Sequence, residues 1–268
     1  MKNKHEAAPK GGHRELWNAE AERYAMSPTA SIAEDGFLKI VDAAGVLTPE
    51  CRVLDLGCGP GIYSAAIAPR VKEVTGLDVS EEMIARAQAR AREAHLTNCR
   101  FAVTDWKEIN PAPLQGAFDV ALARLTPAIS DEADVQKLCA CAKKRVFIEN
   151  FIDRRHPWMT LAFEIAEAGK PWNDDRLFDI LSYLLKTGRR PRLYYRPAHW
   201  GTAERPWRQV ADFCLRRLAL RMRVCDELQR EILAAFEKRS RGGLLDARET
   251  LTLMTIEFAP DGSLPTHC

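Results

Sequence analysis

The sequence predicts an α/β protein with a seven-stranded, mostly parallel sheet, helices on both faces and a helical cap. Between residues 50 and 152, short apolar segments alternate with segments of helical periodicity. Strands separated by helices form right-handed crossovers and therefore a parallel sheet. Several apolar segments end in an acid, and a glycine-rich turn follows the first of them. The 268 residues, 46% of them hydrophobic, suffice for one large core and an elaboration.

The first part of the chain contains five expected strands, each short and apolar. They lie at 51–57, 73–78, 99–105, 118–124 and 145–151. Helices are expected at 62–68, where Pro69 ends the helix, after Ser80, and at 131–143. Ser80 is a typical N-cap residue, and Glu81 and Glu82 follow where the helix dipole favours acids. The apolar stripe of this helix consists of Met83, Ile84, Ala87 and Ala91.

The second part of the chain is less regular. Two more strands are expected at 191–200 and 250–259. Helices are expected at 158–169, at 174–187, from Pro206 in a first turn to Leu218, and around 228–236 before Gly242 and Gly243. We therefore divide the chain into a tail (1–13), a core (14–152), a helical cap with substrate-binding insertions (153–249), a final strand (250–260) and a second tail (261–268).

Composition excludes several classes of protein. No apolar run is long enough to span a bilayer, so no membrane partner is expected. The polar, glycine-ended start does not resemble a signal peptide, which predicts a cytoplasmic protein with reduced thiols. The eight cysteines include no C-x-x-C pair, so we expect no metal site.

The stretch VLDLGCGPGIYS, residues 53–64, places three glycines at every second position after an apolar run. Such a turn lets the backbone approach a ligand closely. A phosphate-binding P-loop is excluded because no Gly-Lys-Ser/Thr ending is present, and a dinucleotide fingerprint would need Gly or Ala in place of Ile62. Asp55, two residues before Gly57, adds a carboxylate that can hold an ammonium group.

VLDLGCGPG resembles the first motif of class I S-adenosylmethionine (SAM) dependent methyltransferases, whose fold is Rossmann-like. The resemblance implies SAM as cofactor and S-adenosylhomocysteine (SAH) as product. It also implies that Asp78 binds the ribose hydroxyls and that Asp105 and Trp106 contact the adenine. Taken singly, Asp78 and Asp105 are alternatively helix caps or turn acids. The implied cofactor-binding residues are Asp55, Gly57, Cys58, Gly59, Gly61, Asp78, Val79, Met83, Asp105, Trp106 and Arg124.

Three residues are candidates for a catalytic role: Tyr24, Arg124 and His199. The segment ELWNAEAERYAMSP, 15–28, resembles the opening helix of small-molecule methyltransferases, which implies that Trp17 and Tyr24 close over the methyl donor. Helix packing is the alternative, because these two residues lie two turns apart on one face. Arg124 can hold a substrate carboxylate or form an ion pair with a nearby acid. His199 is either a base or a structural residue.

These features predict a methyltransferase similar to the small-molecule (UbiE-like, methyltransferase type 11) group. It would act by in-line displacement on a small, anionic or aromatic acceptor. The predicted cap departs from the quinone-modifying members, and ARLTPAI after the fourth strand lacks the Asn-Pro-Pro-Tyr motif typical of adenine-N6 and glutamine methyltransferases.

Two alternatives stay open. The first is an RNA or protein methyltransferase that uses the basic stretch 186–223, where eleven Lys or Arg stand against two acids. A solvated helical face is the simpler explanation of that stretch. The second alternative is a SAM-binding protein without transferase activity.

Overall fold

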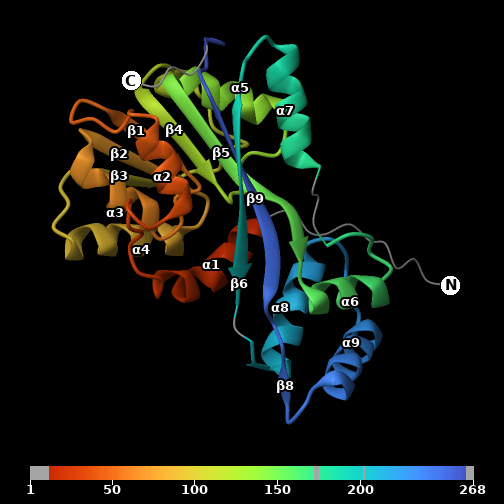
Figure 1. Cartoon of the computed structure of the whole chain (residues 1–268). Helices are drawn as coiled ribbons and strands as arrows, with labels where there is room; N and C mark the ends of the chain where they lie inside the picture. The colour runs from red at the N-terminus through yellow and green to blue at the C-terminus, as the bar shows by residue number, and fades with distance from the viewer. Residues whose placement is uncertain (1–11, 172–174, 202, 264–268) are drawn as a thin grey trace. The chain divides into compact units, whose positions relative to one another are not determined.

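The computed structural model describes residues 12–171, 175–201 and 203–263 (Figure 1). The chain forms two compact units, which are described separately. The sheet unit consists of Trp17–Asn150, Asp175–Arg196 and Met254–Cys268. The helical unit consists of Met1–Leu16, Phe151–Asp174 and Pro197–Leu253. Most of the two expected tails, 1–13 and 261–268, lies outside the described residues.

The seven-stranded sheet has the order β3-β2-β1-β4-β5-β9-β6. Its strands are β1 (Arg52–Leu56), β2 (Glu73–Asp78), β3 (Cys99–Val103), β4 (Phe118–Arg124), β5 (Ala142–Arg155), β6 (Arg192–Trp200) and β9 (Glu249–Phe258). The pairs β1–β2, β2–β3, β1–β4 and β4–β5 are parallel, which confirms the predicted sheet. Strand order reverses beside β1, and open α/β sheets bind ligands at the carboxyl ends of the strands around such a reversal.

The helices of the sheet unit include all those predicted in the first part of the chain. They are α1 (Gly12–Ala25, from Trp17 onward), α2 (Gly36–Ala43), α3 (Ile62–Ile67), α4 (Glu81–Glu93), α5 (Glu132–Cys141) and α7 (Arg176–Lys186), with 3-10 turns at Ala68–Arg70 and Ala112–Leu114. Ser80 caps α4 as predicted, because its Oγ accepts the Met83 amide at 3.1 Å. The predicted α4 stripe is buried throughout. The predicted helix 131–143 ends at Cys141, since Ala142 already pairs with Phe118 in the sheet.

Helix α2 is an additional element that the sequence pattern does not predict. The Asp35 carboxylate caps it by accepting the amides of Phe37 and Leu38 at 2.9 and 3.0 Å. Phe37, Leu38 and Val41 are fully buried and pack with α3 and the inner strands in one apolar core. Burial of these three side chains, each worth about 1.5–3 kcal/mol, stabilises a helix that is too short to form alone.

The helical unit has a core of its own. It contains α6 (Pro157–Ile165), α8 (Trp207–Ala219) and α9 (Asp226–Arg239), together with the short antiparallel strands β7 (Arg205–Pro206) and β8 (Leu244–Leu245). Apolar residues at helical spacing, such as Phe163, Leu218, Ile232 and Phe236, form that core. Pro206 is the N-cap of α8 rather than part of its first turn.

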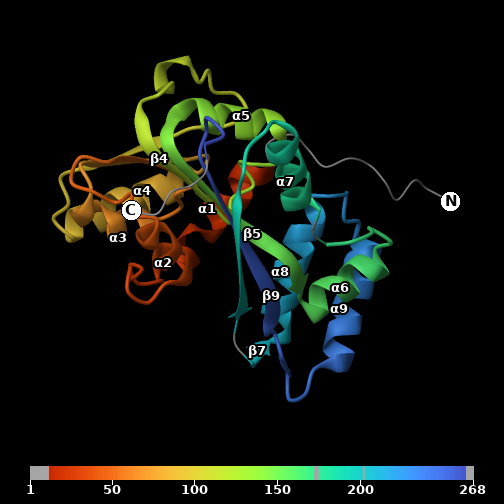
Figure 2. The same cartoon turned by 45° about the horizontal axis from the view of Figure 1, so that its top comes forward.

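Helix α7 is placed differently from the expectation. We expected it among the cap insertions of 153–249, but it belongs to the sheet unit and contacts α5, as both views show (Figures 1 and 2). Its buried face, formed by Leu177, Ile180, Tyr183 and Leu184, explains that position.

Neither a membrane-spanning helix nor a metal centre is found in the described part of the chain. No helix there is both long and apolar enough to cross a bilayer. No three His, Cys, Asp or Glu side chains gather there as a metal site would require.

Candidate cofactor and acceptor site

The turn between β1 and α3 has a backbone that glycine adopts readily and other residues do not. Gly57 has a φ of +71° and Gly59 a φ of +53°. The Gly57 amide donates to the Leu77 carbonyl at 2.7 Å, which ties the turn to β2. A Cβ on Gly57 would lie 2.2 Å from Thr126 Oγ1, whereas among described atoms a Cβ on Gly59 would meet only Met83 Sδ, at 3.9 Å. The space beside Gly59 is therefore open to a ligand.

The remaining residues at the turn contribute close packing and no charged side chain. Gly61 begins α3 so close to α4 that a Cβ there would lie 3.0 Å from the Ala87 Cβ. Cys58 is buried, and burial raises the pKa of its thiol well above the usual range. Met83 is buried and Val79 half-buried. Because none of these side chains is ionised, the charge at the turn comes from aspartates.

Asp78 ends β2 and faces the glycine turn. Its Oδ2 accepts the Gly59 amide at 2.9 Å and its Oδ1 accepts the Ser80 amide at 3.0 Å. Burial raises the pKa of Asp78, although both amides favour the charged form. A carboxylate has about four acceptor sites, so room remains for further donors such as vicinal hydroxyls. Asp78 is thus a turn acid in this structure and is also equipped to bind a ligand.

Asp55 is a buried acid beneath the same turn. Its side chain accepts a hydrogen bond from Ser64 Oγ at 2.6 Å. Burial raises the pKa of Asp55 to about 6, and the hydrogen bond from Ser64 partly opposes that rise. A cation held at the turn, such as an ammonium group, would favour the ionised carboxylate.

The segment after β3 is fastened to α5 by contacts that the sequence does not indicate. The Asp105 side chain accepts the Lys107 amide at 2.9 Å. Lys107 and Lys137 both bind the buried carboxylate of Asp134, and Lys137 also donates to the Trp106 carbonyl. Trp106 is only 2% exposed, which leaves half-buried Asp105 as the more accessible of the two expected adenine contacts.

Arg124, the last residue of β4, forms an ion pair. Its Nε lies 2.9 Å from Glu149 Oε1, and the Glu149 side chain is completely buried. Its guanidinium carbon lies 4.4 Å from the centre of the Tyr63 ring and 5.8 Å from that of Phe37. The ion-pair alternative for Arg124 is therefore present in the structure.

Helix α1 contacts the start of α4, immediately after Asp78. The Asn18 side chain accepts a hydrogen bond from Ser80 Oγ at 2.6 Å and donates to Glu81 Oε2 at 3.2 Å. Tyr24 is half-buried, and its ring packs edge-to-face on Trp17 with 6.1 Å between centres. The packing alternative is thus observed for these rings, and a role over the methyl donor stays a prediction.

His199 does not belong to the sheet unit. It is an exposed residue of β6 within Pro197–Leu253, which belongs to the helical unit. The other predicted site residues from Tyr24 to Arg124 all belong to the sheet unit. A catalytic role for His199 therefore stays a prediction.

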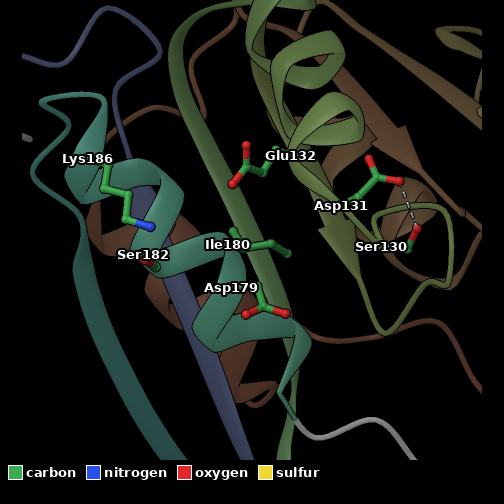
Figure 3. A pocket seen from close by; sticks show the side chains of 7 residues that line it. All are labelled: Ser130, Asp131, Glu132, Asp179, Ile180, Ser182 and Lys186. Carbon is green, nitrogen blue, oxygen red and sulfur yellow. Dashed lines mark hydrogen bonds between the residues drawn. The ribbon is translucent and has the colours of Figure 1, made fainter.

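A groove of about 300 Å³ lies between α5 and α7 in the sheet unit (Figure 3). It is lined by Ser130, Asp131, Glu132, Asp179, Ile180, Ser182 and Lys186. Ser130 Oγ and Asp131 Oδ2 lie 3.5 Å apart at one end, and Lys186 comes from the far end of α7. None of the predicted site residues lines this groove.

Two residues after β4 support the turn through contacts that the sequence does not indicate. Leu125 has a φ of +52°, which is uncommon for a residue with a side chain, and its amide donates to the Glu149 carbonyl at 2.8 Å. This sharp exit brings Thr126, which is buried, against Gly57. No sequence pattern predicts a leucine in this conformation. The one available signal is its position directly after a strand.

Comparison with known proteins agrees with this geometry. Residues 47–154 match a family model described as a methyltransferase domain. An uncharacterized protein of Haemophilus influenzae is 35% identical over 123 residues, 44% of this chain and 43% of its own length. A ubiquinone biosynthesis O-methyltransferase of Albidiferax ferrireducens is 32% identical over 94 residues, 35% of this chain and 37% of its own. The chain thus spans less than half the length of these curated relatives.

Relatives also include an RNA-modifying enzyme. The 23S rRNA (uracil(1939)-C(5))-methyltransferase RlmD of Aliivibrio salmonicida is 32% identical over 96 residues, 36% of this chain and 22% of its own length. Among solved structures, magnesium protoporphyrin IX methyltransferase of Synechocystis, with bound SAH, has a TM-score of 0.53 at 17% identity, covering 91% of this chain and 97% of its own. Protein BH2331 of Bacillus halodurans has a TM-score of 0.53 at 17% identity, covering 83% and 98%.

The sheet order, the glycine turn and the family match agree on the fold. Residues 47–154 match the family model of a methyltransferase domain. The chain has the fold of the class I, SAM-dependent methyltransferases, as the resemblance of VLDLGCGPG predicts.

Proposed function

We propose that this protein binds SAM at the glycine turn and transfers its methyl group to a small-molecule acceptor. The observation that carries the proposal is the combination of open space beside Gly59 with two carboxylates, buried Asp55 and half-buried Asp78, at the carboxyl ends of β1 and β2. SAM carries an ammonium group and a ribose diol, and these are groups that such carboxylates bind. Asp105 would accept a hydrogen bond from the adenine amine.

The protein's part in such a reaction is mainly to bind and orient. SAM, when bound, would supply a methyl group activated by a sulfonium. Asp78 would hold the ribose through charge-assisted hydrogen bonds while its two backbone contacts fix the carboxylate. At Gly59 the turn would present backbone without a side chain to the ligand. Methyl transfer in line needs little acid–base assistance, so alignment in a water-poor pocket supplies much of the rate.

Contacts made by the basic stretch 186–223 within the chain favour a small molecule over a macromolecule as acceptor. Several of its arginines are engaged within the chain. Arg216 binds Asp212, Arg189 donates to the Pro260 carbonyl, and Arg190 donates to the Gly188 carbonyl. Side chains occupied in this way contribute less to a phosphate-binding surface. The ubiquinone and protoporphyrin methyltransferases among the similar proteins also act on small molecules by name.

RNA methylation is the second candidate, because the RlmD proteins are among the relatives. One experiment separates the two. Purified protein is incubated with methyl-labelled SAM and host lysate, and small molecules, RNA and protein are then separated. Label in the small-molecule fraction is the expected result, whereas label in RNA would replace the proposal with the second candidate.

An Asp78→Ala variant serves as the control for this experiment. Because it removes the carboxylate expected to hold the ribose, labelling by the variant should fall in parallel with its affinity for SAH in calorimetry. Binding of SAH by the wild-type protein without label in any fraction would favour a SAM-binding protein without transferase activity.

A further inference from the structure

A polar row crosses four adjacent strands of the sheet unit, in the order β4, β5, β9 and β6 (Figure 1). Its members are Arg124, Glu149, Thr255 and Arg196, one from each strand. Arg124 and Glu149 are direct partners in the register of β4 and β5. Interior strands of α/β sheets are normally apolar, so a row of this kind requires an explanation.

Glu149 is the centre of the row and binds all the other members. Arg196 donates to it through two nitrogens, from Nε to Oε2 at 3.2 Å and from Nη2 to Oε1 at 2.7 Å. Thr255 Oγ1 donates to Oε2 at 2.6 Å, and Arg124 Nε lies 2.9 Å from Oε1. One carboxylate therefore holds two guanidinium groups next to each other.

Burial within the row is uneven. The Glu149 side chain is 0% exposed, whereas those of Arg124 and Arg196 are 16% and 24% exposed. The carboxylate is thus the covered member, and the two arginine side chains are the members that reach solvent. Each guanidinium has five N–H donors, so donors remain on both arginines after the contacts to Glu149.

Two other acids of the sheet unit, Asp35 and Asp55, are engaged with partners of their own. Asp35 accepts the amides of Phe37 and Leu38 and the Tyr63 hydroxyl, the last at 3.0 Å. Asp55, whose charge Arg124 stabilises, binds Ser64 Oγ. The Tyr63 ring covers one face of the Arg124 guanidinium, which leaves the edge of that group for a planar ligand.

The position of the row relates it to the glycine turn. Asp55 and Leu122 are register partners on β1 and β4, and Arg124 lies two residues beyond Leu122 at the carboxyl end of β4. Leu125 and Thr126 then lead from Arg124 onto Gly57. Arg124 therefore lies close to the turn, whereas Arg196, on β6, lies further along the sheet on the side of β1 away from β2 and β3.

We infer that the acceptor carries an oxyanion, a carboxylate or a phosphate, that binds the exposed edges of Arg124 and Arg196. In this arrangement Glu149 is a positioning residue, because it acts through the two arginines. The inference rests on the proposed function and adds the chemical class of the substrate. A two-arginine fork gives an oxyanion several charge-assisted hydrogen bonds in a fixed geometry.

The first experiment tests the arginines without turnover. The Nε–H resonances of the arginines are followed by NMR in the SAH-bound protein during titration with inorganic phosphate, with sodium chloride at equal ionic strength as reference. We expect the Arg124 and Arg196 signals to shift with phosphate and not with chloride, and Arg196→Gln to weaken phosphate binding about tenfold or more. Equal shifts with both salts would overturn the inference.

The second experiment tests the acceptor itself. Labelled product from the lysate assay is applied to an anion-exchange resin, where an anionic product is retained. Arg196→Gln should raise the amount of extract needed for half-maximal labelling about tenfold or more, with SAH affinity and maximal rate nearly unchanged, and Arg196→Lys should restore part of the loss. A product that passes through the resin, or an unchanged half-maximal amount, would overturn the inference.

The second experiment has a matched control variant, and a failure of the proposed function can be told apart from a failure of the inference. Arg145→Lys alters another buried ion pair of β5, with Glu257 at 3.4 Å, and should leave half-maximal labelling unchanged. If the wild-type protein labels no small molecule, the proposed function fails. The phosphate titration then still decides whether the arginine pair binds an oxyanion.

Discussion

Alanine substitutions at Gly57 and Gly59 distinguish a loss of space for the ligand from a loss of folding stability. Gly57→Ala places a Cβ 2.2 Å from Thr126 Oγ1 and 2.5 Å from Thr126 Cβ, well inside the repulsive range. Gly59→Ala places a methyl group where Met83 Sδ, at 3.9 Å, is the one neighbour within 4 Å among the described atoms. Both positions have positive φ, which costs a residue with a Cβ about 1–2 kcal/mol.

These geometries give different expected magnitudes. Gly59→Ala should lower the free energy of unfolding by about 1–2 kcal/mol, which corresponds to about 2–8 °C in Tm for a chain of this size. Gly57→Ala adds overlap with buried Thr126, and overpacking costs about 1–3 kcal/mol more. Gly59→Ala should nevertheless lose at least about tenfold in SAH affinity, because its methyl group takes space assigned to the cofactor.

Scanning fluorimetry measures the stability and calorimetry measures the SAH affinity. Gly116→Ala is the matched control, since Gly116 has a φ of +58° and a Cβ there would only touch Lys143 Cε at 3.6 Å. It should show the cost of positive φ without a change in SAH affinity. Wild-type affinity in a folded Gly59→Ala variant would refute the assignment of this space to SAM.

Three further predictions concern individual side chains of the sheet unit. Burial raises the pKa of Asp55 to about 6. Because the folded protein holds this proton more tightly than the unfolded chain, the free energy of unfolding of the wild-type protein should fall by roughly 3 kcal/mol as pH rises from about 4 to above 6. Urea unfolding of Asp55→Asn should lack that decrease. Arg90→Ala removes the donors to the Ala25 and Ser27 carbonyls and to Thr29 Oγ1, so hydrogen exchange should quicken at 25–29 with little change in Tm. Tyr63→Phe removes the hydrogen bond to Asp35 and should lower the free energy of unfolding in urea by about 1 kcal/mol, with SAH affinity unchanged. A loss of SAH affinity would mean that the hydroxyl reaches the ligand.

The sheet and the glycine turn could be predicted because their signals are local. The strand at 73–78 has the bounds that the sequence indicates, since an apolar run ending in Asp78 is followed directly by the Ser80 cap. The glycine spacing likewise fixes a turn of positive φ within a few residues. Each of these features is decided by backbone sterics and hydrogen bonds between near neighbours.

The part of Arg196 in the proposed acceptor site could not be predicted because its contacts join residues that are distant in sequence. Arg196 and Glu149 are 47 residues apart, and Thr255 and Glu149 are 106 apart. In sequence, Arg196 is one of many arginines in a basic stretch, and a solvated face is the simplest explanation for all of them. Only the order of the strands shows that this one arginine shares a carboxylate with Arg124.

The exit of β4 connects the two halves of the proposed site. The Glu149 carbonyl accepts the Leu125 amide, while its carboxylate pairs with Arg124, so one residue of β5 holds both the backbone and the side chain at this point. A leucine with positive φ costs about 1–3 kcal/mol, and these contacts offset that cost. The same bend presses Thr126 against Gly57. In the proposed enzyme, the geometry that aims Arg124 at an acceptor is therefore also the geometry that closes the cofactor turn, and neither can relax without the other.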